Sequence, residues 1–267
     1  MSAFLDASKW ERTAPGAYTT EVDGAWSQGR GMFGGLIGAA VVRAVEETAG
    51  PDSGGLRSLH LHLCAPLRVG QARLFTKVER RGPGLVFVSA RVLQGGKVAA
   101  FGSGCTGRAR DRRLDFADAV CPVMAPASEV VPLGPSPLLP AFAKDHVEYR
   151  FAWGPAPLSG GDRAESGGWI RLREPSPLDP AMCAALLDAW PPAVYSRTDQ
   201  PHVLGTTALA MHVVGELPPR DLPVDTAWGL TVHSRTTHAG FADEENRLWT
   251  PSGALLAVAR QVVTFVR

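Results

Sequence analysis

The chain has 267 residues, 45% of them hydrophobic, which is enough to bury one large core or two smaller ones. Its 27 basic and 26 acidic residues leave a net charge of +1 without a basic patch or tail, so nucleic acid and anionic membrane surfaces are poor candidates as partners. No apolar run approaches the roughly 20 residues of a membrane helix, and the first ten residues lack the apolar core of a signal peptide, so we expect a cytoplasmic protein.

The four cysteines are scattered, with neither the paired spacing of a metal site nor the density of a disulfide framework. Free cysteine is among the most buried residue types, so we expect reduced and mostly buried thiols. His60 and His62 share one face of a predicted strand, but no third ligand is in view, and we expect structural roles for both. The sequence therefore predicts no metal and no cofactor.

The first half of the chain predicts one helix followed by an antiparallel meander. Apolar residues crowd positions 34–47, and Gly50 and Pro51 follow, a pattern typical of a helix and its end. The start of this helix is rich in glycine, which suits a backbone that another group approaches closely. β-rich or alternating runs then predict four strands, at residues 56–66, 71–79, 85–93 and 97–106.

The segment 111–145 differs from both of its neighbours, because six prolines fall between residues 121 and 140. Proline suppresses both helix and central strand, so we expect a long linker over the surface. The order of elements then repeats. Asp179 and Pro180 predict the capped start of a second helix that runs to Trp190. Strands are predicted on both sides of it, at residues 146–153, 168–173, 205–215, 226–237, 241–249 and 254–266.

The two halves also match in sequence where the last strand of each begins, at Gly96–Ala100 and Gly253–Ala257. One helix plus a meander, present twice, indicates a duplication in which two antiparallel sheets each wrap a central helix. We therefore expect an α+β fold with two domains, residues 1–110 and 146–267, joined by the linker 111–145.

Three polar positions in the second half are candidates for a site. Asp188 lies in a short apolar helix without a neighbouring cation, where a carboxylate is costly unless it faces solvent, is hydrogen-bonded or is functional. Thr206 and Thr207 open the next strand, where a hydroxyl can bond a water or a carbonyl. Gln261 interrupts the apolar last strand and must satisfy both a donor and an acceptor. Its first-half counterpart is Gly104, so the second half would supply the polar side chains.

Several longer motifs carry a resemblance to a known family: Trp26, MFGG (32–35), LHLHLCAP (59–66), the segment 80–100, DPAMCAALLDAWPP (179–192), GTTALAMHV (205–213) and SGALLAVARQ (252–261). Over most of its length the chain resembles the acyl-CoA thioesterase II family, the TesB-type double-hotdog thioesterases. The resemblance implies a tandem double-hotdog fold, hydrolysis of a fatty or related acyl-CoA to free acid and CoA, and a homo-oligomer, a dimer of double hotdogs.

The resemblance also implies roles for individual residues. In that family an aspartate on the second-half helix, a hydroxyl residue early in the next strand and a glutamine in the last strand orient and activate the attacking water. The matching positions are Asp188, Thr206 and Gln261, and Thr206 matches better than Thr207. With Asp188 as the general base, backbone N–H groups at the start of the first helix would bind the oxyanion and the thioester. Gly34 and Gly35 would supply these groups, and Phe33 beside them would contact the substrate.

Two departures and two alternatives remain. Ala208 and Ala210 stand where many relatives carry an acidic residue and then a hydroxyl residue, which leaves the substrate and the efficiency open. Arg80 and Arg81 beside a turn are candidates for CoA phosphates, or are simply solvated. An enoyl-CoA hydratase or dehydratase shares the fold class, although neither helix contains a histidine. A non-catalytic acyl-CoA-binding protein is the other alternative, although the three polar positions are all present.

Overall fold

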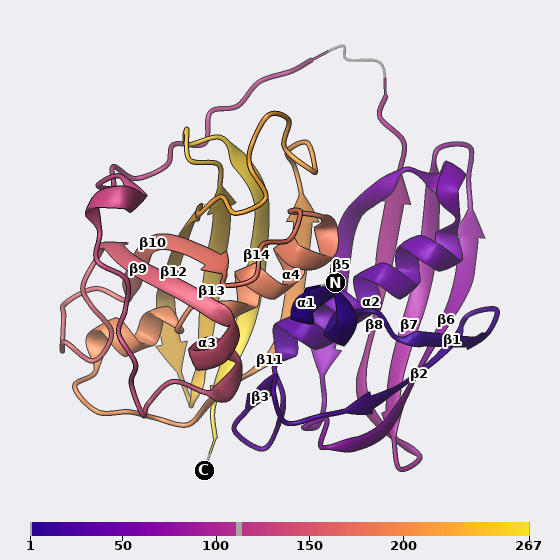
Figure 1. Cartoon of the computed structure of the whole chain (residues 1–267), viewed down its shortest axis with the longest axis horizontal. Coiled ribbons are helices and arrows are strands. Elements are labelled where there is room, and N and C mark those ends of the chain that lie inside the picture. The colour runs from indigo at the N-terminus through magenta and orange to yellow at the C-terminus, as the bar shows by residue number, and fades with distance from the viewer. Residues whose placement is uncertain (1, 111–113, 267) are drawn as a thin grey trace.

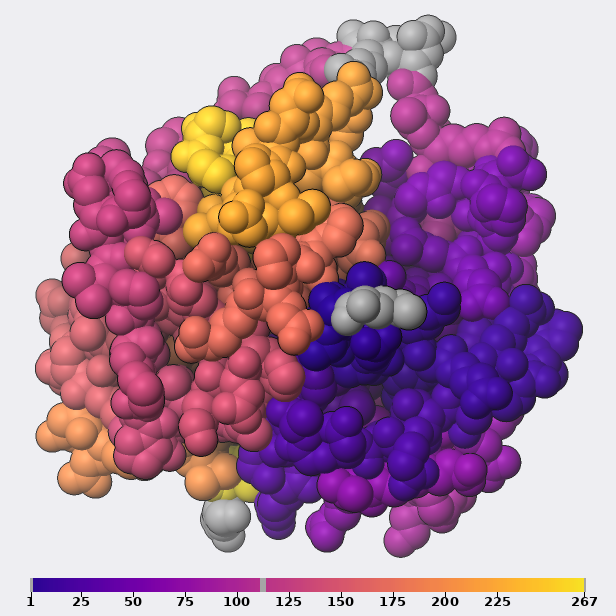
Figure 2. All heavy atoms as spheres, viewed as in Figure 1, coloured from indigo at the N-terminus to yellow at the C-terminus, as the bar shows by residue number. Residues whose placement is uncertain are grey.

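The computed structural model describes residues 2–110 and 114–266, and it is built around one antiparallel sheet that carries two central helices on the same face (Figure 1). The indigo start of the chain lies against the second half, so the two halves share a surface beyond their common sheet (Figure 2). None of the described helices is long and apolar enough to cross a membrane.

The first half contains the predicted helix and meander, preceded by elements that the sequence patterns did not indicate. The unexpected elements are α1 (Ala3–Ser8), the edge strands β1 (Glu11–Ala14) and β2 (Ala17–Val22), and a small hairpin of β3 (Ser27–Gln28) and β4 (Gly31–Met32). The predicted ones are α2 (Gly34–Ala49), β5 (Gly55–Leu63), β6 (Gly70–Arg81), β7 (Leu85–Gln94) and β8 (Lys97–Gly107), with the short helical turn η1 (Pro51–Ser53) after α2.

The second half repeats this order with a shorter central helix. Its elements are β9 (Val147–Trp153), β10 (Glu165–Leu172), α4 (Pro180–Ala189), the helical turn η3 (Ala193–Arg197), β11 (Leu204–Val213), β12 (Trp228–His238), β13 (Phe241–Trp249) and β14 (Leu255–Phe265). The predicted cap is present, since the Asp179 carboxylate accepts a hydrogen bond from the Met182 backbone N–H at 2.7 Å and Pro180 opens the helix.

The strand β10 begins three residues before its predicted start at residue 168. Gly168, the first residue of the predicted strand, and Gly167 before it both lie inside β10, where the register with β9 shifts at a bulge. Gly168 has a φ of +156° there, and a side chain at this position would collide with the backbone of Arg150. The glycines therefore serve a close backbone approach within the sheet.

The sheet has twelve strands in the order β1-β2-β6-β7-β8-β5-β11-β14-β13-β12-β10-β9. Six consecutive strands come from each half, and the two sets are arranged symmetrically about the β5–β11 junction. At this junction Leu59 lies opposite Met211 and Leu61 opposite Leu209, and all four side chains are buried. This arrangement confirms the tandem double-hotdog fold, in which each half wraps its sheet around a central helix.

The two central helices pack against each other beneath the joined sheets. Gly38 of α2 faces Ala184 of α4. A Cβ added at Gly38 would lie 3.5 Å from the Cβ of Ala184, so the space between the helices holds little more than a methyl group. Arg43 of α2 also forms an ion pair with Asp179 at 3.0 Å and donates a hydrogen bond to Ser8 at 2.9 Å. The capping residue of α4 is thus also tied to the other half of the molecule.

The segment predicted as a linker contributes more structure than expected. It contains the turn η2 (Ala127–Glu129), and α3 (Ala141–His146) begins inside the predicted linker with Phe142 and Ala143 buried. The Trp169 indole donates a hydrogen bond to the Ala125 carbonyl at 2.8 Å. Residues 111–113, which belong to the same segment, lie outside the described residues. Proline did exclude long helices and central strands here, but it did not prevent the segment from packing against the second half.

The expectation of mostly buried thiols is wrong. All four cysteines are free, but only Cys183, on α4, is buried; Cys64 is exposed, and Cys105 and Cys121 are intermediate.

Candidate active site

Asp188 lies at the end of α4, where this helix meets the first turn of α2. A methyl group on Gly34 would lie 2.8 Å from Oδ2 of Asp188, so the backbone of α2 approaches the carboxyl closely. The backbone N–H of Gly35 favours the charged form of the carboxyl, as does the positive end of the helix dipole. The second half therefore supplies the carboxyl, and the first half forms one wall around it.

Thr206 is the threonine that faces Asp188. Its Oγ1 lies 3.1 Å from Oδ1 of Asp188 and 3.0 Å from Oε1 of Gln261, whereas the Thr207 hydroxyl donates to the Val262 carbonyl on the adjoining strand. A β-bulge explains this choice. The register of β11 with β14 shifts between Thr206 and Ala208, so Thr206 turns to the same face as the buried Leu209.

Gln261 is 3% exposed and has both ends of its amide occupied. Its Nε2 donates to the carbonyl of Leu187 at 3.3 Å, and its Oε1 accepts from Thr206. The Thr206 hydroxyl has one proton and two acceptors within reach, so one of the two contacts requires a proton from elsewhere. A protonated Asp188 supplies it by donating to Thr206, which then donates to Gln261.

Burial raises the pKa of Asp188 from 3.8 to about 7, against the opposing effects of its contacts with Thr206, Gly35 and Gln261. A carboxyl with a pKa close to the surrounding pH can both take up and release a proton, as a general base must.

Phe33, Gly34 and Gly35 form the start of α2. Phe33 is buried, and its ring stacks on that of Phe142 with centroids 3.9 Å apart, which fixes the entry into the helix. A side chain on Gly35 would collide with this ring and lie 2.8 Å from the Ala185 carbonyl. The backbone N–H groups of Gly34 and Gly35 belong to the first turn, where no carbonyl of the helix itself can accept them.

The three polar side chains open into a cavity of about 260 Å³. Its walls come from α4 and the segment after it, the strands β11, β13 and β14, the linker and the β3 hairpin. Apolar and aromatic residues form much of the lining, including Leu138, Phe142, Trp190 and Val263. Neither Ala208 nor Ala210 belongs to the lining.

Two buried polar residues of β13 were missed by the sequence analysis. Glu244 lines the same cavity, and Asn246 donates a hydrogen bond to the Leu187 carbonyl at 2.6 Å. Both are 1% exposed and lie on the strand face that also carries the buried Ala242 and Leu248. Alternation along this strand was the available signal, since it puts two polar residues on an apolar face.

The corresponding positions of the first half are apolar. Gly104 occupies the register position in β8 that Gln261 occupies in β14. Leu56 precedes a bulge in β5 as Thr206 precedes one in β11, so these two residues correspond. Val88 and Ala90 correspond to Glu244 and Asn246. At these four positions the first half is apolar where the second half is polar, which agrees with the expectation that polar side chains would come from the second half.

The remaining candidates lie elsewhere. His60 and His62 are on the exposed outer face of the sheet, where His60 contacts His212 and His62 stacks on Phe101. Within the part of the chain that the structure describes, no group of three His, Cys, Asp or Glu residues is placed to hold a metal ion.

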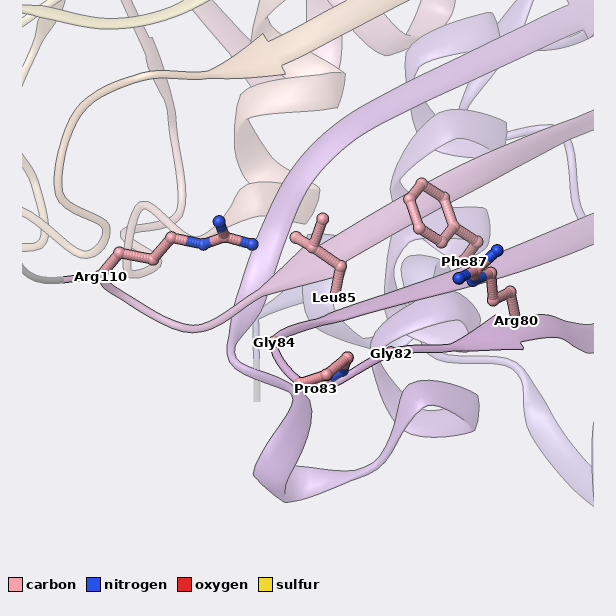
Figure 3. A pocket seen from close by; sticks show the side chains of 7 residues that line it. All are labelled: Arg80, Gly82, Pro83, Gly84, Leu85, Phe87 and Arg110. Carbon is pink, nitrogen blue, oxygen red and sulfur yellow. The ribbon is translucent and has the colours of Figure 1, made fainter.

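The turn that contains the two candidate arginines forms a shallow pocket of its own (Figure 3). Arg80 and Arg110 lie on its two sides, and Arg81 donates a hydrogen bond to the Ala49 carbonyl at 3.0 Å. Ala49 is the last residue of the 16-residue helix α2, whereas Asp188 faces its first turn. Since an α-helix rises 1.5 Å per residue, about 20 Å separate this pocket from the carboxyl.

Comparison with known families identifies both halves. Residues 22–107 match the acyl-CoA thioesterase N-terminal domain, and residues 119–265 match the acyl-CoA thioesterase C-terminal domain. The chain belongs to the acyl-CoA thioesterase family. It is a thioester hydrolase of the TesB type, as the resemblance in sequence implied. A search of curated protein sequences found no match to this thioesterase.

Solved structures share the fold of this thioesterase over nearly the whole chain. A hotdog-fold protein of unknown function from Alicyclobacillus acidocaldarius has a TM-score of 0.91 at 21% identity, covering 100% of this chain and 99% of its own. A candidate thioesterase II from Thermobifida fusca YX has a TM-score of 0.85 at 23% identity, covering 100% and 98%. The acyl-CoA thioesterase II TesB2 of Mycobacterium marinum has a TM-score of 0.77 at 17% identity, covering 99% and 98%.

Dehydratases of the same architecture are more distant from this thioesterase. The dehydratase domain of PpsC from Mycobacterium tuberculosis has a TM-score of 0.57 at 15% identity, covering 94% of this chain and 93% of its own.

Proposed function

We propose that this thioesterase hydrolyses a short-chain acyl-CoA to the free acid and CoA, with Asp188, Thr206 and Gln261 as its catalytic side chains. The observation that carries the proposal is the hydrogen-bonded arrangement of these three residues, which come from three separate elements and meet at one cavity. In the reaction, the Asp188 carboxylate takes a proton from water as the water oxygen bonds to the thioester carbonyl carbon. The carbon–sulfur bond then breaks, and the CoA thiolate takes up the proton that Asp188 had accepted, which returns Asp188 to the carboxylate.

Thr206 and Gln261 would orient the water. A water that donates one proton to Asp188 needs a second fixed contact if its lone pair is to point at the carbonyl carbon. The Thr206 oxygen, 3.1 Å from the carboxylate, is in reach of the same water. Gln261 holds that hydroxyl through its own carbonyl, and it is held in turn by the end of α4.

The first turn of α2 would stabilise the oxyanion. Backbone N–H groups at a helix N-terminus are fixed donors, and they gain from the helix dipole. Gly34 and Gly35 present such groups beside Asp188, where the absence of side chains lets the first turn of α2 approach the carboxyl closely. Phe33 would define the wall next to them through its stacking on Phe142. In this assignment both halves contribute to one site.

The size of the cavity favours a short acyl group. Its volume of about 260 Å³ is smaller than the roughly 300–1,000 Å³ of typical ligand sites. Large aromatic side chains, Trp190 and Phe142 among them, form part of its lining. We therefore expect acyl groups of a few carbons to be preferred over long fatty chains.

The CoA phosphates would lie in a neighbouring groove of about 500 Å³ that shares Tyr195, His202 and Leu204 with the acyl cavity. Arg197 and Arg235 line this groove, and neither forms an ion pair with a described residue. Replacing both by alanine should raise KM for acyl-CoA at least tenfold while leaving hydrolysis of the matching acyl-pantetheine unchanged. The corresponding double variant of Arg80 and Arg110 is the control, and an equal loss with both thioesters would contradict this placement.

The outer face of the sheet is where two copies would associate. The aromatic side chains Phe75, Phe87 and Phe101 are each about 40% exposed on neighbouring strands of this face. We propose a homodimer in which these surfaces meet. Sedimentation of the wild type and of Phe101→Asp would test it, because the charge should convert the dimer into a folded monomer.

Thiol release from a panel of acyl-CoAs, from acetyl to palmitoyl, tests the function directly. The wild type should release CoA most rapidly from short substrates, and Asp188→Asn should lower kcat about 100-fold or more, the range that general-base catalysis supplies. Asp243→Asn, on the outer face of β13, is a matched control that should retain full activity. If folded wild type released no thiol from any substrate, the proposed hydrolysis would be contradicted, and calorimetry with a non-hydrolysable acyl-CoA would test binding alone.

A further inference from the structure

Glu244 is a second carboxyl group in the same cavity as Asp188. It lies on the inner face of β13, directly opposite Gln261 in the register with β14, and it is 1% exposed. No role follows for it from the mechanism above.

The contacts of Glu244 are unusual for a carboxylate. Its Oε2 accepts a hydrogen bond of 2.6 Å from the backbone N–H of Ala193, and the Asn246 amide also favours its charged form. No cation would compensate a negative charge on Glu244, because its carboxyl forms no ion pair with a described residue and no Lys or Arg lines the cavity. A buried carboxyl without a cation is stable mainly as the neutral acid.

The charged and titratable groups around Glu244 favour the same state. Asp188 on α4 and Asp243 on its own strand both oppose a negative charge on Glu244. The other titratable groups of the cavity are Tyr149, Tyr195 and His202. Burial is the largest effect and, together with these carboxylates, raises the pKa of Glu244 to about 8.

The fold itself does not require a carboxyl here. In the first half, Val88 occupies the corresponding position opposite Gly104 and is fully buried. A valine thus completes the interior of a half that lacks a polar site. At this strand position an acid is buried only in the half that carries Asp188, which argues for a role in the site.

We propose that Glu244 is a further positioning residue of the thioesterase site, an acid that keeps its proton while Asp188 is ionised and so limits the cavity to a single negative charge. The proposal rests on the proposed function. Attack on the thioester places negative charge on the carbonyl oxygen, and a second carboxylate in the same cavity would oppose that charge. An ionised Glu244 would also make Asp188 harder to ionise.

The consequence is a bell-shaped dependence of kcat/KM on pH. Activity rises as Asp188 loses its proton around pH 7, and it falls as Glu244 loses its own around pH 8. Glu244→Gln cannot ionise, but it has the same size and an oxygen that can accept from Ala193. The falling limb should therefore disappear, so that the variant exceeds the wild type about 30-fold at pH 9.5, which is 1.5 pH units above the pKa of about 8, while matching it within about threefold at pH 6.5.

Two further variants separate this role from a structural one. Glu245→Gln alters the next residue on the same strand, which faces outward and pairs with Arg247, and it should keep the wild-type profile. Glu244→Val introduces the residue of the first half. It should also lose the falling limb, with a lower kcat at every pH because the contact with Ala193 is gone. The proposal is wrong if Glu244→Gln keeps the falling limb, or if it loses activity equally at all pH values.

A measurement that needs no activity tests the proton itself. In the infrared spectrum at pH 7, wild type should have the carbonyl band of a protonated buried carboxylic acid, and this band should lose intensity in Glu244→Gln. An unchanged band would overturn the proposal even for a protein that hydrolyses no acyl-CoA. Conversely, if the wild type hydrolysed no acyl-CoA but its band still lost intensity in Glu244→Gln, the neutral Glu244 would stand and only the proposed hydrolysis would be rejected.

Discussion

At the scale of single residues, the choice between Thr206 and Thr207 has the clearest functional consequence. Thr206→Val removes the hydroxyl that contacts Asp188 and Gln261, and a hydrogen bond to a charged group contributes about 1.5–3 kcal/mol. We expect kcat to fall about 10- to 100-fold, and Thr206→Ser to recover most of the loss. Thr207→Val is the matched control, because its hydroxyl bonds only the Val262 carbonyl. Steady-state kinetics with the best acyl-CoA check the prediction, and an equal effect at both positions would contradict it.

A second prediction at this scale concerns Gly34. In Gly34→Ala the new methyl group would lie 2.8 Å from Oδ2 of Asp188 and 2.7 Å from Leu63, closer than carbon atoms approach without a shift. The carboxyl must move, so we expect kcat to fall at least tenfold even where the protein stays folded.

Gly38→Ala is the control for this change. It lies one turn further along α2, and its methyl group would meet Ala184 at an ordinary 3.5 Å. It should retain activity and stability. Thermal unfolding beside the kinetics separates a displaced carboxyl from a general loss of structure, and full activity in Gly34→Ala would contradict the close approach.

At the scale of elements, Asp179 links helix capping to the contact between the halves. One carboxylate oxygen accepts from the Met182 N–H and the other pairs with Arg43 of α2. Asp179→Ala should lower the free energy of unfolding by about 1–2 kcal/mol, the usual effect of losing such a cap. Asp179→Asn retains the cap and loses only the partly exposed ion pair, so its loss should be smaller. Denaturant unfolding of both variants checks the order, and equal losses would assign the whole effect to the ion pair.

At the scale of the whole molecule, the buried carboxyls link stability to pH. Both folded-state pKa values are raised, to about 7 for Asp188 and about 8 for Glu244, so the folded state binds more protons than the unfolded one. Stability should therefore be highest near pH 4–5 and fall as pH rises towards 8. Glu244→Gln should remove part of this fall and be more stable than wild type at pH 9, by on the order of 5 kcal/mol for a pKa raised from 4.5 to about 8. Chemical unfolding at pH 5, 7 and 9 measures the difference, and a parallel decline in both proteins would contradict it.

Much of the fold could be predicted because its patterns are local. Alternating apolar residues predict β5, and an apolar run that ends at Gly50 and Pro51 predicts α2 with its glycine-rich start. The edge strands β1 and β2 escaped prediction because their residues are mostly exposed or half-buried and carry no clear alternation. Within the linker, the burial of Phe142 depends on a ring from the other half, Phe33, which no local pattern contains.

The chain alone indicates that the second half carries the polar groups, because Asp188 and Gln261 interrupt apolar elements whose first-half counterparts are apolar. Alternation from Leu209 backwards would have put Thr207 inside, and only the bulge, formed in pairing with β14, turns Thr206 inward. Glu244 joins the site because β13 also pairs with β14. The local sequence of a strand does not specify which strand it will pair with or which helix it will face. Composition and periodicity decide which surfaces are buried, whereas the register between distant strands decides which buried side chains meet.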